Sequence, residues 1–149
     1  MKTTKTMLAA TFIWIGMVFA ISFMEAWLKF RAPGITLALG LGIGRLVFNA
    51  LNKMEWVLAL LILLQLFFSK QRRGRTENFA FHLPLGILLV QTFWLLPALD
   101  ARAALHISGA TPPLSHHHIY FAAMEVTKTI CLFVFGISLL KRLKETQGH

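Results

Sequence analysis

Residues Phe23 to Trp56, FMEAWLKFRAPGITLALGLGIGRLVFNALNKMEW, place polar side chains between two long apolar runs. The charged and amide residues in this stretch are Glu25, Lys29, Arg31, Arg45, Asn49, Asn52, Lys53 and Glu55. A charged side chain in a bilayer needs a partner, and it usually faces the protein interior or a water-filled cavity. We therefore expect these groups to form a polar site at, or just inside, one face of a membrane.

The composition of the whole chain is typical of a polytopic helical membrane protein. The 149 residues are 56% hydrophobic and only 14% charged, and the mean hydropathy is +0.65. Soluble domains carry about 25% charged residues. The length accommodates four spans of about 20 residues each. We predict an all-α, single-domain, four-transmembrane-helix bundle over residues 1–149, with spans at about 7–28, 46–68, 79–98 and 116–140.

The connection between the first two spans carries helix-breaking residues. Pro33 and Gly34 are expected to end the first helix. Residues 35–45, ITLALGLGIGR, form either a short re-entrant or interfacial helix or the leading turn of a long second span. We favour a short helix that merges into the second span. Gly40 and Gly44 are four residues apart, a spacing that allows another helix to approach closely.

Basic residues are distributed as topology signals. The net charge is +9, but the Lys and Arg residues fall between and beyond the apolar runs, which argues against a nucleic-acid partner. Nine of them lie in the N-terminal head, the 69–78 loop and the C-terminal tail, against five in the other two connections. The positive-inside rule then predicts a multi-pass membrane protein with both termini cytoplasmic.

Several classes of chemistry are excluded by the residues that are missing. Cys131 is the only cysteine, so the chain has no internal disulfide and no Cys-x-x-Cys redox pair. The sequence also lacks a nucleophile elbow, a phosphate-binding loop and a His-Glu-x-x-His motif. It therefore favours a non-enzymatic role, and no catalytic residue is assigned.

Polar residues from all four predicted spans fall at the same, external level. They predict a ligand or ion pocket formed by Glu25, Arg45, Asn49, Asn52, Glu55, Asp100, Glu125 and Lys128. Lys128 lies at the midpoint of the fourth span, where an ammonium group costs about 2.5–3.5 kcal/mol to insert. We expect it to pair with Glu55 or Glu125. Such a pair would either hold two helices in register or act as an ion relay or ligand clamp.

The histidines that open the fourth span raise the possibility of a metal site. His118 and Glu125 are seven residues apart and share a helix face, and His116 and His117 lie beside them. A zinc site needs three or four convergent ligands. A divalent metal ion held by His116, His117, His118 and Glu125 is therefore one hypothesis for a cofactor. A polar helix start with interfacial histidines is the alternative.

The segment GRLVFNALN, together with Trp14, Gly16 and Phe19 before the Pro-Gly break, carries a resemblance to known proteins. The chain resembles a family of small uncharacterised bacterial four-helix integral membrane proteins. It is also distantly similar to a widespread transmembrane family that has a human member linked to cisplatin resistance. The resemblance implies a four-helix membrane fold and a place in the bacterial cytoplasmic (inner) membrane, and it carries no site residue with it.

Two functional hypotheses from different classes follow. The first is an integral membrane protein whose outward-facing Glu/His/Lys pocket binds or passes a small solute, a proton or a metal ion. The second is a structural or assembly subunit with no ligand, whose partner beyond the lipid bilayer is another copy or another membrane protein. A small membrane enzyme that uses His/Glu acid–base chemistry is a third and weaker hypothesis.

Overall fold

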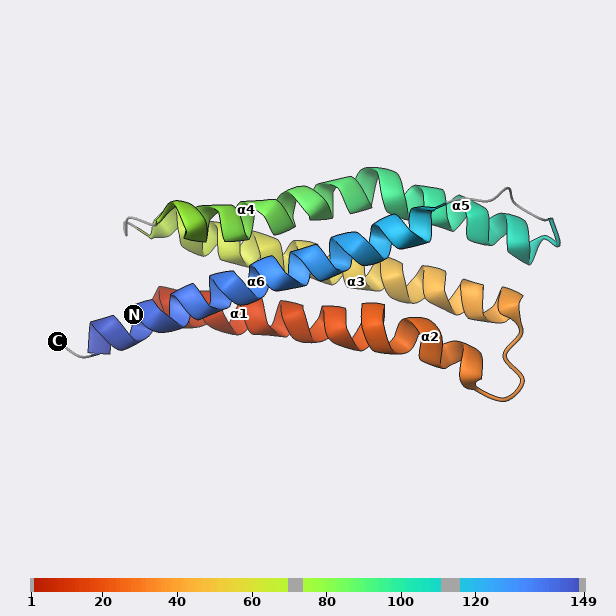
Figure 1. Ribbon diagram of the computed structural model, residues 1–149, viewed down its shortest axis with the longest axis horizontal. Coiled ribbons are helices and arrows are strands. Elements are labelled where there is room, and N and C mark those ends of the chain that lie inside the picture. The colour runs from red at the N-terminus through yellow and green to blue at the C-terminus, as the bar shows by residue number, and fades with distance from the viewer. Residues whose placement is uncertain (1, 70–73, 111–115, 148–149) are drawn as a thin grey trace.

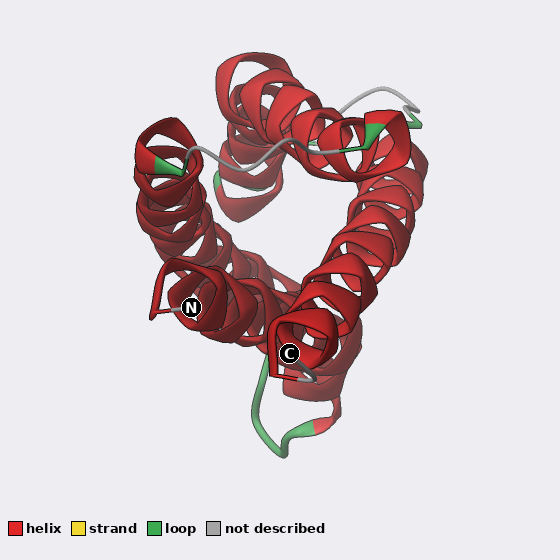
Figure 2. Ribbon diagram, turned by 90° about the vertical axis from the view of Figure 1, so that its left-hand side faces the viewer, coloured by secondary structure: helices red, strands yellow, loops and turns green. Residues whose placement is uncertain are grey.

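The computed structural model describes residues 2–69, 74–110 and 116–147. In this part of the chain four long helical rods lie side by side, and Figure 2, viewed along the bundle, shows them grouped around a common axis (Figures 1 and 2). Each rod is long and apolar enough to cross a membrane: Thr3–Arg31, Leu37–Phe68, Arg75–Ile107 and His117–Thr146. The predicted all-helical architecture with four candidate spans is therefore confirmed, and every rod is longer than the span that the apolar runs predicted.

The first rod changes its helical pitch toward its C-terminal end. It consists of α1 (Lys2–Val18), the π-helical segment η1 (Phe19–Glu25), the short α2 (Ala26–Leu28) and the 3-10 turn η2 (Lys29–Arg31). The chain then becomes extended at Ala32 and turns at Gly34, whose φ of 80° lies in the left-handed region that favours glycine. The Pro33-Gly34 break thus ends the first helix as expected.

The second rod, α3 (Leu37–Phe68), is one continuous helix. Thr36 caps it, because its Oγ1 accepts a hydrogen bond of 3.2 Å from the backbone N–H of Leu39. The separate short helix predicted between the first two spans is not seen. Residues 37–45 instead form the first turns of α3.

Packing explains why the glycines do not interrupt this helix. Gly40 and Gly44 are buried, and the end of the first rod lies across them. A Cβ added to Gly40 would lie 2.2 Å from a ring carbon of Phe30, and one added to Gly44 would lie 3.0 Å from Lys29 Nζ. The glycines therefore allow the close approach expected of a four-residue glycine spacing, and the side chains of Phe30 and Lys29 on the first rod are the neighbours.

The third rod consists of α4 (Arg75–Val90), the π-helical segment η3 (Gln91–Leu95) and α5 (Leu96–Ile107). Pro97 has no N–H to donate to the carbonyl four residues before it, and the widened turn lies directly N-terminal to that position. Gln91, which begins this turn, is only 1% exposed.

The fourth rod, α6 (His117–Gln147), crosses the bundle obliquely and packs mainly against α1 and α4, while α3 packs against α1 and α5 (Figure 1). Both termini lie at the same end of the molecule (Figure 1). The opposite end holds α2 and the end of α5.

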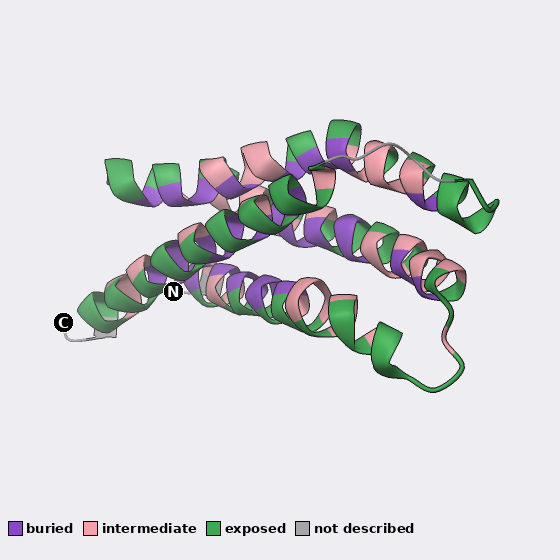
Figure 3. Cartoon of the chain, turned by 45° about the vertical axis from the view of Figure 1, so that its right-hand side comes forward, coloured by how far each residue is buried: buried purple, intermediate pink, exposed green. Residues whose placement is uncertain are grey.

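The distribution of side chains supports a membrane environment. The core contains apolar side chains such as Trp14, Phe81 and Phe135, but it also contains Lys128 at 0% exposure. Large apolar residues are exposed instead, among them Phe67 at 83% and Phe93 at 76%. Figure 3 shows exposed positions along all of the rods. Many exposed large apolar side chains are unfavourable in water, whereas lipid chains are a favourable environment for them.

Candidate functional site

A buried ionic cluster surrounds Lys128 in the middle of the bundle. Its Nζ lies 2.5 Å from Glu55 Oε1 on α3 and 2.6 Å from Glu125 Oε1 on α6. It also donates a hydrogen bond of 2.8 Å to Gln91 Oε1 on η3. The expected pairing of Lys128 with a carboxylate is therefore confirmed, and it involves both candidate partners.

Neutral donors complete this cluster. Trp14 Nε1 on α1 donates to Glu55 Oε1 at 2.7 Å, and Gln91 Nε2 donates to Glu125 Oε1 at 2.7 Å. All four rods thus contribute to one polar contact layer. Glu125 Oε2 is buried without a partner among the described residues. Buried polar groups are normally paired because an unpaired one costs about 1–3 kcal/mol, so the cluster joins the rods through bonds that are individually expensive to break.

A second, adjacent layer joins α3 to the third rod. Thr92 Oγ1 accepts hydrogen bonds from Asn52 Nδ2 at 2.9 Å and from Trp56 Nε1 at 3.0 Å. Its own hydroxyl donates to the backbone carbonyl of Leu88 at 2.7 Å. Asn52, which was predicted to line a pocket, instead hydrogen-bonds to Thr92 between α3 and the third rod.

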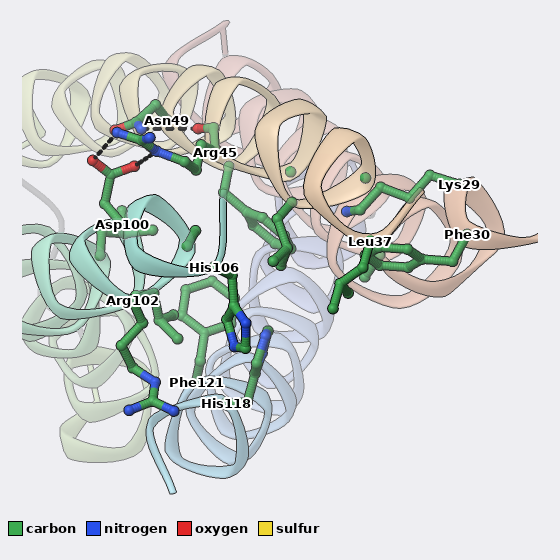
Figure 4. Close-up of a pocket in the computed structure, with 18 residues that line it drawn as sticks. Lys29, Phe30, Leu37, Arg45, Asn49, Asp100, Arg102, His106, His118 and Phe121 are labelled. Atoms are coloured by element: carbon green, nitrogen blue, oxygen red, sulfur yellow. Dashed lines mark hydrogen bonds and ion pairs between the residues drawn. The ribbon is translucent and has the colours of Figure 1, made fainter. Parts of the chain in front are cut away.

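The pocket lies farther along the bundle, at the end away from the termini. Its volume is about 400 Å³, and the end of the first rod, the start of α3, α5 and the start of α6 all contribute to it (Figure 4). The lining residues are Ala26, Lys29, Phe30, Leu37, Gly40, Leu41, Gly44, Arg45, Phe48, Asn49, Leu96, Leu99, Asp100, Arg102, Ala103, His106, His118 and Phe121.

An ion pair between α3 and α5 forms one wall of this pocket. Arg45 contacts Asp100 through two of its nitrogens, and the bond from the terminal Arg45 nitrogen to Asp100 Oδ2 is 2.7 Å (Figure 4). Asn49 Nδ2 donates to the backbone carbonyl of Arg45 at 2.8 Å. Two parallel bonds give a guanidinium–carboxylate pair a fixed geometry, so this wall positions its charges firmly.

A second ion pair lies at the edge of the pocket. Lys29 Nζ is 3.1 Å from Glu25 Oε2 and lies 5.4 Å and 5.3 Å from the ring centroids of Phe30 and Phe48. Glu25, predicted as a pocket residue, thus acts through Lys29 and does not itself line the cavity.

A third polar group was only partly anticipated from the sequence. Arg102, His106 and His118 lie together at the α5–α6 side of the pocket (Figure 4). Among the described residues Arg102 has no ion-pair partner within 4.0 Å. In the sequence, Arg102 is one of the five basic residues in the first and third connections, where it serves as a topology signal. The sequence feature that could have predicted this grouping is the spacing of four residues between Arg102 and His106, which places both on one face of a helix.

The pocket predicted from the sequence therefore corresponds to two separate places. Arg45, Asn49 and Asp100 line the cavity, whereas Glu55, Glu125 and Lys128 form the ionic cluster. Between them lie Phe48 and Phe121, whose rings meet edge to face at 5.2 Å. Both rings line the pocket, and Phe121 precedes Glu125 by about one helical turn.

The proposed metal ligands do not converge. Among the described residues no group of three or more His, Cys, Asp or Glu side chains is arranged to hold a metal ion. Glu125 is bonded to Lys128 and Gln91, the ring of His117 lies against Trp94, and His118 lines the pocket. The histidines form a polar helix start at which the carbonyl of His116 accepts from the first backbone N–H groups.

At the terminal end of the bundle Glu77 on α4 pairs with Arg142 on α6. This pair is a further polar contact between rods, outside the two layers described above.

Comparisons with protein-family models, with curated proteins and with solved structures gave no match. The resemblance carried by GRLVFNALN therefore stays a prediction, and the function has to be inferred from the geometry of the pocket and the ionic cluster.

Proposed function

We propose that this chain is an integral protein of the bacterial cytoplasmic membrane whose pocket faces outward and binds a small anionic solute. The bias of Lys and Arg toward the N-terminal head, the 69–78 loop and the C-terminal tail supports cytoplasmic termini. The termini and the pocket lie at opposite ends of the bundle (Figure 1). With cytoplasmic termini the pocket opens to the outside.

The charge of the pocket supports an anion. Arg45 and Asp100 neutralise each other, and so do Lys29 and Glu25. The positive charge of Arg102 remains, with the imidazoles of His106 and His118 beside it (Figure 4). A planar guanidinium group matches the geometry of a phosphate or carboxylate and offers it two bonds. The observation that carries the proposal is that Arg102 lines the pocket without an ion-pair partner among the described residues.

The shape of the pocket supports binding over a purely structural role. Ligand sites are concave, mostly apolar, and supplied with a few polar groups that fix orientation. The cavity of about 400 Å³ has this character. The ionic cluster at Lys128 does not, because its side chains bond to one another and none of them lines the pocket.

That cluster favours the second candidate function, a structural or assembly subunit of a membrane complex. Buried ion pairs often specify an arrangement of helices more than they add stability. Under this alternative the partner would be another copy or another membrane protein, and the pocket would bind no anion. The enzymatic alternative has less support, since Phe121 lies between His118 and Glu125 along α6.

Thermal unfolding in a neutral detergent tests the proposal with inorganic phosphate as the probe. A ligand that binds only the folded state stabilises it by about 2.7 kcal/mol at one hundred times Kd. We expect phosphate to raise the Tm of the wild type by several degrees, and to raise that of Arg102→Gln by much less.

The matched control is Lys53→Gln, which removes an exposed positive charge on α3 outside the pocket. Phosphate also stabilises folded proteins generally, because it strengthens apolar burial. The test is therefore the difference in the phosphate-induced Tm shift between the variants. Equal shifts in the wild type, Arg102→Gln and Lys53→Gln would reject the anion site and favour the structural alternative.

A further inference from the structure

The depth of the pocket along the bundle narrows the class of ligand. The rods of 29 to 33 residues are about 44–50 Å long at 1.5 Å per residue, whereas the hydrocarbon core of a bilayer is about 30 Å thick. Charged or polar residues end the apolar runs at the terminal end of the bundle. Counting about 20 residues inward from Lys5, Ser69, Arg75 and Lys141 reaches Glu25, Asn49, Leu95 and Phe121.

The lining of the pocket begins at these four positions. It is formed by residues 26–30, 37–49, 96–106 and 118–121, all at or beyond the far edge of a core placed in this way. The cavity therefore lies at the level of the lipid head groups.

The surface around the pocket remains apolar although it lies beyond the hydrocarbon core. Trp27 is 52% exposed and Tyr120 is 50% exposed, and these two residue types are enriched at membrane interfaces. Aliphatic and aromatic side chains exposed at the same level are Leu28, Phe30, Leu37, Leu39, Leu46, Leu105, Ile107 and Ile119. Lipid therefore has a favourable apolar surface directly beside the cavity.

The helices that enclose the cavity diverge at this level. The N-terminal end of α6 lies beside α5, across the bundle from α2 (Figures 1 and 3), and the extensive packing of α6 is with α1 and α4. Phe30 of the first rod and Phe121 of α6 both line the pocket. Phe30 and Leu37 are also 39% and 59% exposed, so the apolar lining of the pocket continues onto the outer surface of the bundle.

We propose that the ligand is an anionic amphiphile, a membrane lipid whose phosphate head group is held by Arg102 and whose chains run from the apolar lining at Leu96 and Phe121 toward the hydrocarbon core. This inference rests on the proposed anion site and adds the apolar part of the ligand. Lys29 and the imidazoles of His106 and His118 supply further donors to the head group. Basic pockets between transmembrane helices are a recurrent form of lipid head-group site.

Native mass spectrometry of the full-length, delipidated protein in a neutral detergent tests this inference. The probes are phosphatidylglycerol, which is anionic, and phosphatidylcholine with matched chains, which is zwitterionic. We expect the wild type to retain phosphatidylglycerol at least about tenfold more tightly. Arg102→Gln should reduce that preference by about tenfold, the size of one charge-assisted contact.

Two further variants distinguish lipid binding in the pocket from nonspecific electrostatic attraction of an anionic lipid to the protein. Lys53→Gln removes a surface charge outside the pocket and should retain the full preference. Leu99→Trp fills the cavity while leaving its charges in place, and it should lose lipid binding, which provides a test if Arg102→Gln folds poorly. A preference that falls equally in Arg102→Gln and Lys53→Gln, or that survives Leu99→Trp, overturns the lipid site.

Inorganic phosphate distinguishes failure of this inference from failure of the proposed function. Competition between phosphate and phosphatidylglycerol in the wild type supports a shared anion site. Stabilisation by phosphate without retention of phosphatidylglycerol rejects the amphiphile and leaves the anion site standing. If neither probe binds, both proposals are wrong.

Discussion

At the scale of single residues, burying Lys128 carries a large free-energy cost that its neighbours have to offset. Its ammonium group is fully buried, and Glu55, Glu125 and Gln91 from three different rods supply the oxygen atoms around it. Burying an ion is expensive, and only good geometry with further hydrogen bonds offsets that cost. The cluster therefore penalises any arrangement of the helices that separates these partners.

A stability measurement can test this role of Lys128. We expect Lys128→Met to lower the Tm in detergent, because removing one partner of a buried pair costs roughly 3–5 kcal/mol. In this variant two carboxyl groups are left facing each other. Combining Lys128→Met with Glu55→Gln should restore part of the loss, since one of the unpaired carboxyl groups is then neutralised. An unchanged Tm of the single variant would contradict a stabilising role of the buried ion pair.

Sequence reasoning succeeded at Lys128 because its depth in the span forces a pairing, whatever the detailed structure. It did not find Trp14, Gln91 or Thr92 as partners. A single indole or amide in an apolar run can equally face lipid, and only the rotation of the helix decides. For the same reason, polar residues at one predicted level were assigned to one pocket, although packing divides them between the ionic cluster and the cavity.

At the scale of helical elements, the contact between the first rod and α3 is built on glycine. Gly40 lies under the ring of Phe30, whereas Gly42 has nothing within 4 Å of the position of an added Cβ. The glycine-rich composition of residues 35–45 is compatible with a separate short helix and with the leading turn of a long span, and glycine itself lowers helix propensity. Tertiary packing outweighs that preference here, and α3 begins at Leu37.

These two glycines provide a matched pair of substitutions. Gly40→Ala should destabilise the protein, because the new methyl group displaces the ring of Phe30 from the pocket wall. Gly42→Ala should be neutral or stabilising by up to about 1 kcal/mol, the gain in helix propensity. Thermal unfolding of both variants in the same detergent compares them. Equal effects would mean that the approach of the first rod to α3 does not depend on Gly40.

At the scale of the whole molecule, four rods with both termini at one end require an even number of crossings (Figure 1). The number of candidate spans could be predicted from the apolar runs, because the hydropathy of a 20-residue window does not depend on how the helices pack. The lengths of the rods could not be predicted in this way, because the helices continue beyond the apolar runs. That extra length at one end forms the pocket, so the side on which this end lies decides which solutes can reach it.

The orientation of the molecule is the last prediction. Cys131 is the only cysteine, so replacing it by Ala gives a background for single-cysteine labelling in intact cells. Gly74 precedes α4 at the terminal end, and Ser108 follows α5 at the pocket end; both residues are exposed. With cytoplasmic termini, an impermeant maleimide should label Ser108→Cys in intact cells and Gly74→Cys only after permeabilisation. The reverse pattern would place the pocket on the cytoplasmic side and would mean that this chain does not follow the positive-inside rule. The anion site would then be reached by cytoplasmic solutes and by lipids of the inner leaflet.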